Sequence, residues 1–259
     1  MRFSPRVGAL SLVSLAFGAT LACHAPESRS DAADAGRATA GATAPAKAGS
    51  AIASDSGEAA TAAPLSATSS ATTRTGKPRI VALVDSLTAG LGLAPDQAFP
   101  AVLQRRLDDE GLTYEVVNAG VSGDTSAGGL RRLDWSLEGD VRILIVALGG
   151  NDALRGLPVE ELRSNLSSII SQAQARGIRV ILAGMEAPPN YGPVYARSFH
   201  QVFPDLAKQY QVALLPFLLQ GVAGVAPLNQ SDGIHPTVEG ARMVADNVWT
   251  VLQPMVKRS

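Results

Sequence analysis

Three residues that together could transfer an acyl group occur at two well-separated places in this chain. Ser86 follows an apolar run at 80–84, whereas Asp232 and His235 lie together in a short loop at 232–236. A serine hydroxyl becomes a nucleophile when a histidine takes its proton, and a carboxylate on the other ring nitrogen orients that histidine. The pattern therefore predicts Ser86 as nucleophile, His235 as base and Asp232 as its orienting carboxylate.

Acyl transfer also needs hydrogen-bond donors for the oxyanion that forms at the attacked carbonyl, each worth about 3–4 kcal/mol. The candidates are the backbone amides of Ser86 and Gly123 and the side chain of Asn151, because each follows an expected strand. A glycine lets the backbone approach a ligand closely, and an asparagine is also common in ordinary turns. We interpret the neighbouring Gly120 as a simple turn residue.

The loop at 232–236 has a second interpretation, in which Asp232 or Thr237 caps the final helix. The chain has two other histidines. His24 lies in the N-terminal segment, and His200 lies among apolar residues of an expected helix, where a packing or surface role is the more common outcome. His235 is therefore the candidate base.

The overall composition argues against several other kinds of function. The net charge is −1, so no basic face for nucleic acid is expected. One cysteine and three histidines leave no Cys/His metal set, and we expect no metal and no cofactor. Phosphate-binding glycine loops are absent from the sequence. Val84 and Thr88 occupy the glycine positions of a G-x-S-x-G elbow around Ser86, which argues against an ordinary α/β-hydrolase.

Alternating strands and helices must position the candidate residues. Apolar runs predict strands at 79–84, 114–118, 142–148, 178–183 and 212–216. Helical spacing predicts helices at 96–110, 126–137, 159–176, 194–210 and 238–256, with Pro204 and Pro254 as candidate breaks. This alternation predicts the α/β class, with a parallel sheet covered by helices on both faces. The loops that follow the strands would then meet at one edge of the sheet.

The N-terminal part of the sequence predicts a targeting signal. Arg2 and Arg6 precede an apolar run at 7–22 that is shorter than the ~20 residues of a membrane span, so we interpret 1–22 as a signal peptide. Cys23 follows a sequence similar to a bacterial lipoprotein cleavage box and is the expected lipidation site. The alternative is a cysteine removed with, or left near, an ordinary signal peptide.

Residues 23–78 are rich in Ala, Ser, Thr, Gly and Pro, which predicts a disordered tether. The alternative is a linker with no specific role. The folded domain is expected at 79–256. We expect an extracytoplasmic protein that is lipid-anchored to a bacterial membrane, or secreted or periplasmic, and that meets a membrane only through such an anchor.

Four short segments resemble the conserved blocks of the SGNH, or GDSL-type, hydrolase family. Residues 85–90, 122–125, 149–152 and 232–236 are similar to blocks one, two, three and five, in that order. Segments at 154–156, 189–192 and 214–217 are similar to the thioesterase I/lysophospholipase L1/arylesterase branch. The resemblance covers 79 to about 256 and implies a three-layer α/β/α sandwich with a five-stranded, flavodoxin-like parallel sheet.

The resemblance implies a serine esterase that forms an acyl-enzyme on Ser86. Implied substrates are small-molecule esters: lysophospholipids, aryl esters or short acyl esters, with thioesters as further candidates. It implies Leu154, Leu157 and Tyr191 as substrate contacts, and the default oligomeric state is a monomer. The alternative is a non-catalytic surface lipoprotein that binds acyl chains or glycans.

One residue departs from the family pattern. Val84 stands where the family usually has glycine, directly before Asp85 and Ser86. The departure removes no catalytic group, so we expect it to alter rate or specificity. It is also the only feature of the sequence that favours the non-catalytic alternative.

Overall fold

Residues 76–257 are described by the computed structural model of this protein. The expected signal peptide, Cys23 and residues 23–75 of the expected tether lie outside the described residues. Across the described range, no helix is both long enough and apolar enough to span a bilayer.

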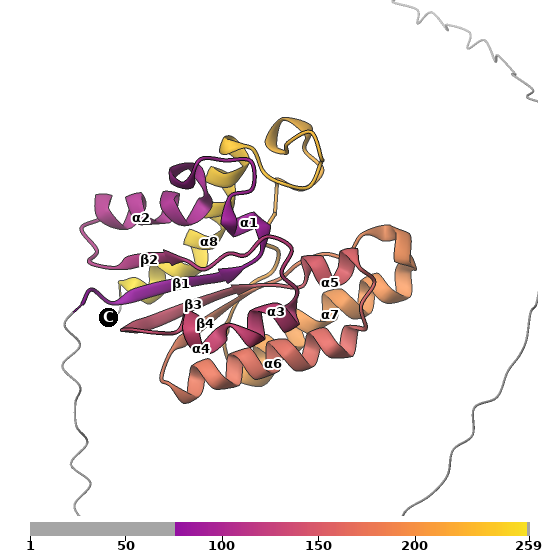
Figure 1. Ribbon diagram of the computed structural model, residues 1–259, viewed down its shortest axis with the longest axis horizontal. Coiled ribbons are helices and arrows are strands. Elements are labelled where there is room, and N and C mark those ends of the chain that lie inside the picture. Colours follow the sequence, from indigo (N-terminus) through magenta and orange to yellow (C-terminus); the bar gives the residue numbers. More distant parts are fainter. Residues whose placement is uncertain (1–75, 258–259) are drawn as a thin grey trace, which may run out of the picture. The chain divides into compact units, whose positions relative to one another are not determined.

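A five-stranded sheet forms the centre of the fold (Figure 1). Every neighbouring pair is parallel, and the strand order is β2-β1-β3-β4-β5. The first strand therefore lies inside the sheet, and the loop that follows it lies between those of two neighbours. The strands are β1 (Arg79–Val84), β2 (Glu115–Asn118), β3 (Val141–Ala147), β4 (Arg179–Ala183) and β5 (Ala213–Leu215).

Helices cover both faces of this sheet, as Figure 1 shows. Helices α2 and α8 pack together on one face, and α3, α6 and α7 pack on the other. The fold class predicted from the sequence is confirmed. The helices are α1 (Ser86–Ala89), α2 (Phe99–Asp109), α3 (Ser126–Arg131), α4 (Leu133–Ser136), α5 (Gly150–Leu154), α6 (Val159–Ala175), α7 (Gly192–Tyr210) and α8 (Val238–Val256), with short 3-10 helices at Pro95–Gln97, Pro189–Tyr191 and Ala226–Leu228.

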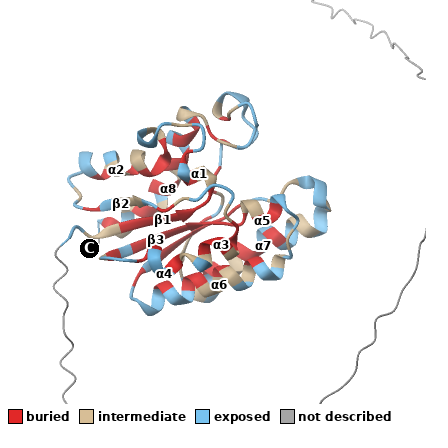
Figure 2. Ribbon diagram, in the orientation of Figure 1, coloured by how far each residue is buried: buried red, intermediate tan, exposed pale blue. Residues whose placement is uncertain are grey.

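The central strands are buried on both sides (Figure 2). β1 and β3 carry continuous apolar runs, which is typical of a parallel sheet covered by helices on both faces. Phe99 and Leu103 of α2 pack on one side, and Phe199 and Phe203 of α7 are fully buried on the other. This packing fixes the strand ends from which the candidate residues project.

Three local expectations were wrong. The single helix expected at 126–137 is two short helices that meet at Arg132. The residues after β1 and β3 form the short helices α1 and α5, where the sequence predicted loops. Pro204 does not break α7, because the carbonyl that it leaves without a donor belongs to His200 on the exposed side of the helix. Pro254 likewise lies within α8, which continues to Val256.

Candidate active site

Ser86, His235 and Asp232 form one continuous hydrogen-bonded chain. The Oγ atom of Ser86 lies 2.8 Å from Nε2 of His235. On the other side of the ring, Nδ1 of His235 lies 2.6 Å from Oδ2 of Asp232. The three side chains thus have the contacts that a nucleophile, its base and an orienting carboxylate require.

The loop itself keeps Asp232 ionised. The backbone amides of His235 and Ile234 donate to Oδ1 of Asp232 at 3.0 and 2.9 Å. These two bonds, followed by the bond to the His235 side chain, hold the pKa of Asp232 well below its ordinary value. Gly233 has a positive φ of 71° and allows the tight turn. A permanently charged carboxylate can stabilise the imidazolium that forms when His235 takes a proton.

Helix capping in this region belongs to Thr237. Its hydroxyl accepts from the Gly240 amide at the start of α8, at 3.3 Å. Asp232 is occupied with His235 and does not cap the helix. The loop is tied down further by a bond of 2.7 Å from the Gln230 amide to the carbonyl of His235.

Asp85 links the segment that carries Ser86 to Asn151, a connection that the sequence did not suggest. One oxygen of Asp85 caps α1 by accepting from the Leu87 amide at 3.0 Å. The other accepts from Nδ2 of Asn151, also at 3.0 Å. Asp85 is only 2% exposed, and burial raises its pKa to about 6 despite these bonds. No signal for this role was present in the sequence, which predicted a loop and not helix α1 after β1.

Gly123 reaches the site on the loop that follows β2. It lines the same cavity as Ser86 and Asn151, and its φ is 80°. Gly120 allows this loop to pack against α1, because a Cβ there would lie 2.5 Å from the amide nitrogen of Ala89. Gly120 is therefore needed for close approach of two backbones, and the interpretation of it as a simple turn residue was incomplete.

A largely apolar cavity of about 570 Å³ opens beside Ser86. Of the three expected substrate contacts, only Leu154 lines it; Leu157 and Tyr191 are not among its lining residues. The Tyr191 hydroxyl instead donates to the carbonyl of Leu154 at 3.0 Å. The hydroxyl of Tyr195 similarly donates to the carbonyl of Leu157 at 2.9 Å. Apolar lining residues from separate segments are Leu87, Leu91, Leu154, Met185, Phe217 and Ile234.

Two further sequence questions concern Val84 and His200. Val84 is fully buried, pairs with Ala147 in the sheet and does not line the cavity. His200 is exposed and pairs at 2.7 Å with Glu186, which lines the cavity, but His200 itself does not line it. In the region 76–257 no cluster of three or more histidine, cysteine, aspartate or glutamate side chains has metal-binding geometry.

Comparison with known proteins points to ester hydrolases. Over 173 residues, the chain is 47% identical to the esterase TesA of Pseudomonas aeruginosa, an alignment covering 66% of this chain and 86% of that protein. Over 178 residues, it is 37% identical to thioesterase 1/protease 1/lysophospholipase L1 of Escherichia coli strain K12, covering 68% of this chain and 84% of that protein.

The fold comparison agrees. The crystal structure of TesA matches with a TM-score of 0.66 and 46% sequence identity, covering 68% of this chain and 98% of that one. The family model of the GDSL-like Lipase/Acylhydrolase family matches residues 85–243. This chain is an ester hydrolase that belongs to the GDSL-like lipase/acylhydrolase family.

Proposed function

We propose that this enzyme hydrolyses carboxylic esters through an acyl-enzyme on Ser86. The observation that carries the proposal is the 2.8 Å contact between Ser86 Oγ and His235 Nε2. His235 takes the hydroxyl proton as Oγ bonds to the ester carbonyl carbon, and it gives that proton to the leaving alcohol. Water then attacks the acyl-enzyme with His235 as base, which releases the acid and returns the proton to Ser86.

The negative charge on the carbonyl oxygen needs donors while each tetrahedral intermediate exists. We assign this role to the amides of Ser86 and Gly123 and to the side-chain nitrogen of Asn151. Support comes from their common position around one cavity and from the hydrogen bond that fixes Asn151 on Asp85. Such donors act by being in place before the charge develops.

The cavity supports a substrate with an apolar acyl or aryl group. Leu87, Leu91 and Met185 are among its lining residues, and Asp85, Glu186 and His235 are the charged or titratable ones. We propose lysophospholipids, aryl esters and short acyl esters as substrates, with thioesters as further candidates. Names of relatives, an esterase and a thioesterase/lysophospholipase, support this range. A panel of esters that differ in chain length and head group would identify the preference.

Sequence features outside the described residues support an extracytoplasmic enzyme attached through Cys23. A lipid on this residue would add a mass that mass spectrometry of the mature protein detects. Replacing Cys23→Ser should then move the enzyme from the membrane fraction to the soluble fraction. Recovery of both proteins in the soluble fraction with an unmodified Cys23 would rule out the anchor.

Covalent labelling separates the hydrolytic mechanism from a binding protein that lacks chemistry. A p-nitrophenyl phosphonate should release one nitrophenolate per wild-type chain and leave its phosphorus on Ser86. Ser86→Ala should lose both labelling and at least about 1,000-fold of its ester hydrolysis, with an unchanged circular dichroism spectrum. Ser198→Ala, at an exposed position of α7, is the matched control and should behave as wild type. Undiminished hydrolysis in folded Ser86→Ala would refute the mechanism.

A further inference from the structure

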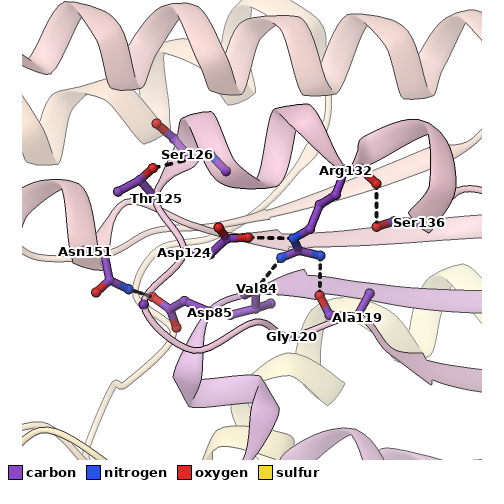
Figure 3. A network of polar contacts seen from close by, with 12 residues as sticks. Val84, Asp85, Ala119, Gly120, Asp124, Thr125, Ser126, Arg132, Ser136 and Asn151 are labelled. Atoms are coloured by element: carbon purple, nitrogen blue, oxygen red, sulfur yellow. Dashed lines mark hydrogen bonds and ion pairs between the residues drawn. The ribbon is translucent and has the colours of Figure 1, made fainter.

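Arg132 joins three segments of the chain through its guanidinium group, as Figure 3 shows. It lies at the junction of α3 and α4, and its side chain is only 15% exposed. Nε donates to Oδ2 of Asp124 at 2.6 Å. Nη1 donates to the carbonyl of Ala119 at 2.5 Å, and Nη2 to the carbonyl of Val84 at 2.8 Å.

Each acceptor is adjacent to a part of the site. Val84 ends β1 and stands two residues before Ser86, and Ala119 directly follows β2. Asp124 directly follows Gly123 in the sequence. One guanidinium group therefore holds the end of the nucleophile strand and both ends of the loop that carries an oxyanion donor.

On the helix side of the Asp124 carboxylate, Gly128 leaves the space that this carboxylate occupies. A Cβ atom at residue 128 would lie 1.9 Å from Oδ1 of Asp124, so only glycine leaves room for this carboxylate. The Asp124 side chain, like that of Arg132, is 15% exposed. The carboxylate thus has a defined position between the helix backbone and the guanidinium group.

The chemistry of these contacts favours arginine. Its planar group presents several N–H donors in fixed directions, and here they reach one carboxylate and two backbone carbonyls. A lysine at this place carries the same charge on a single nitrogen and cannot reproduce the same spread of bonds. Neither Arg132 nor Asp124 lines the cavity, so both act without touching substrate.

We propose that Arg132 is a positioning residue for ester hydrolysis, holding the Gly123 amide and the Ser86 backbone in the geometry that the oxyanion requires. The proposal rests on the roles assigned above to Ser86 and Gly123. Displacement of reacting groups by about 1 Å can cost about 100-fold in rate. Loss of Arg132 should therefore slow the chemical step even in protein that remains folded.

The test compares Arg132→Met and Arg132→Lys with a control, Arg176→Met. Arg176 pairs with Asp134 of α4 at the surface, so the control removes an arginine from the same region without touching the site. Turnover of a p-nitrophenyl ester is divided by the active sites that a phosphonate titrates to completion. We expect kcat per site to fall about 10- to 100-fold in Arg132→Met with little change in KM. Arg132→Lys should be intermediate and Arg176→Met close to wild type.

A purely structural role makes a different prediction. It would lower the melting temperature and the number of titratable sites, while kcat per remaining site stayed at the wild-type value. In a positioning role, the pH profile of kcat/KM keeps its shape, because the loop with Asp232 and His235 is unchanged. A kcat per site within twofold of wild type in Arg132→Met would overturn the proposal.

Gly128→Ala provides a second test if Arg132→Met fails to fold. It displaces the Asp124 carboxylate and leaves Arg132 in place, so kcat per site should again fall and KM should stay near its wild-type value. Wild-type kcat per site in both Gly128→Ala and Arg132→Lys would also overturn the proposal. Ser86→Ala in the same series separates the two ideas, because retained hydrolysis there would refute the role of Ser86 rather than that of Arg132.

Discussion

The two halves of the active site are built in opposite ways. The half that supplies the proposed base is local, since Asp232 and His235 are three residues apart in one loop, and the Asp232 side chain is 43% exposed. The half that supplies the proposed oxyanion donors is assembled over long distances in sequence. There, Asp85 is 2% exposed and holds Asn151, 66 residues away.

The difference follows from what each half must do. Backbone amides lower the pKa of Asp232, so the base half keeps its charge while His235 exchanges protons. Burial raises the pKa of Asp85 to about 6, so the carboxyl beside the oxyanion donors is costly to ionise. Donors aimed at a developing charge are most effective when they are fixed and shielded from water. The proposed proton relay thus ends on a partly exposed carboxylate, Asp232, whereas the proposed oxyanion pocket is supported by a buried one, Asp85.

The largest effect should come from breaking the base half. Asp232→Asn can still accept both backbone bonds on its one oxygen, but its amide nitrogen would donate to Nδ1 and leave the wrong tautomer facing Ser86. We expect kcat to fall about 1,000- to 10,000-fold. Steady-state hydrolysis of a p-nitrophenyl ester measures this loss, and unfolding in urea should show little change. A loss smaller than tenfold would mean that Asp232 does not orient the base.

Removing a donor from the other half should have a smaller effect on rate and a larger one on stability. Asn151→Ala should lower kcat about 100- to 1,000-fold with little change in KM. It also leaves a buried oxygen of Asp85 without a partner, which costs about 1–3 kcal/mol of unfolding free energy. Urea titration at pH 8 would compare it with Asp232→Asn. Equal stability of the two variants would contradict the contrast between the halves.

The buried carboxyl of Asp85 should also leave a signature in stability against pH. Its folded-state pKa of about 6 is above the ordinary 3.8, so folding favours the protonated form. This contribution is complete below pH about 4 and is lost as pH rises through 6. From pH 4 to pH 7, the unfolding free energy of Asp85→Asn should rise by about 2.4 kcal/mol relative to that of wild type. Parallel curves of unfolding free energy against pH for the two proteins would show that burial does not raise the pKa of Asp85.

The smallest effect is expected at the rim of the pocket. Tyr191→Phe removes the hydroxyl that holds the Leu154 carbonyl, a neutral hydrogen bond worth about 0.5–1.5 kcal/mol. We expect a change of about twofold to tenfold in kcat/KM for long acyl esters, and less for acetate esters. Tyr195→Phe is the matched variant on the carbonyl of Leu157. Equal changes for long and short esters would argue against a role of this loop in acyl-chain selection.

The same contrast explains what could be predicted from the sequence. The loop with Asp232 and His235 could be predicted because its carboxylate, glycine and histidine are neighbours in the chain. Strand β1 is visible because a strand buried on both faces has an uninterrupted apolar run. The parallel direction of the strands follows from their alternation with helices, and it places the loops after the strands at one edge of the sheet.

The remaining features depend on contacts that no local pattern encodes. The bond of Asp85 to Asn151 requires β1 and β3 to be neighbours in the correct register. The sequence did not single out Arg132, because the spacing of apolar residues predicted one continuous helix at 126–137 and this residue lies inside it. Its partners lie 8, 13 and 48 residues away, and two of them are backbone carbonyls that any residue type could supply.

The separation of Ser86 from His235 has a consequence for biosynthesis. The two residues are 149 positions apart, with almost the whole sheet between them in sequence. During translation the serine leaves the ribosome long before its base exists, and a domain generally folds as a unit. A nascent chain would therefore carry an inert serine, and hydrolytic capacity would arise only when the segment before α8 docks beside β1.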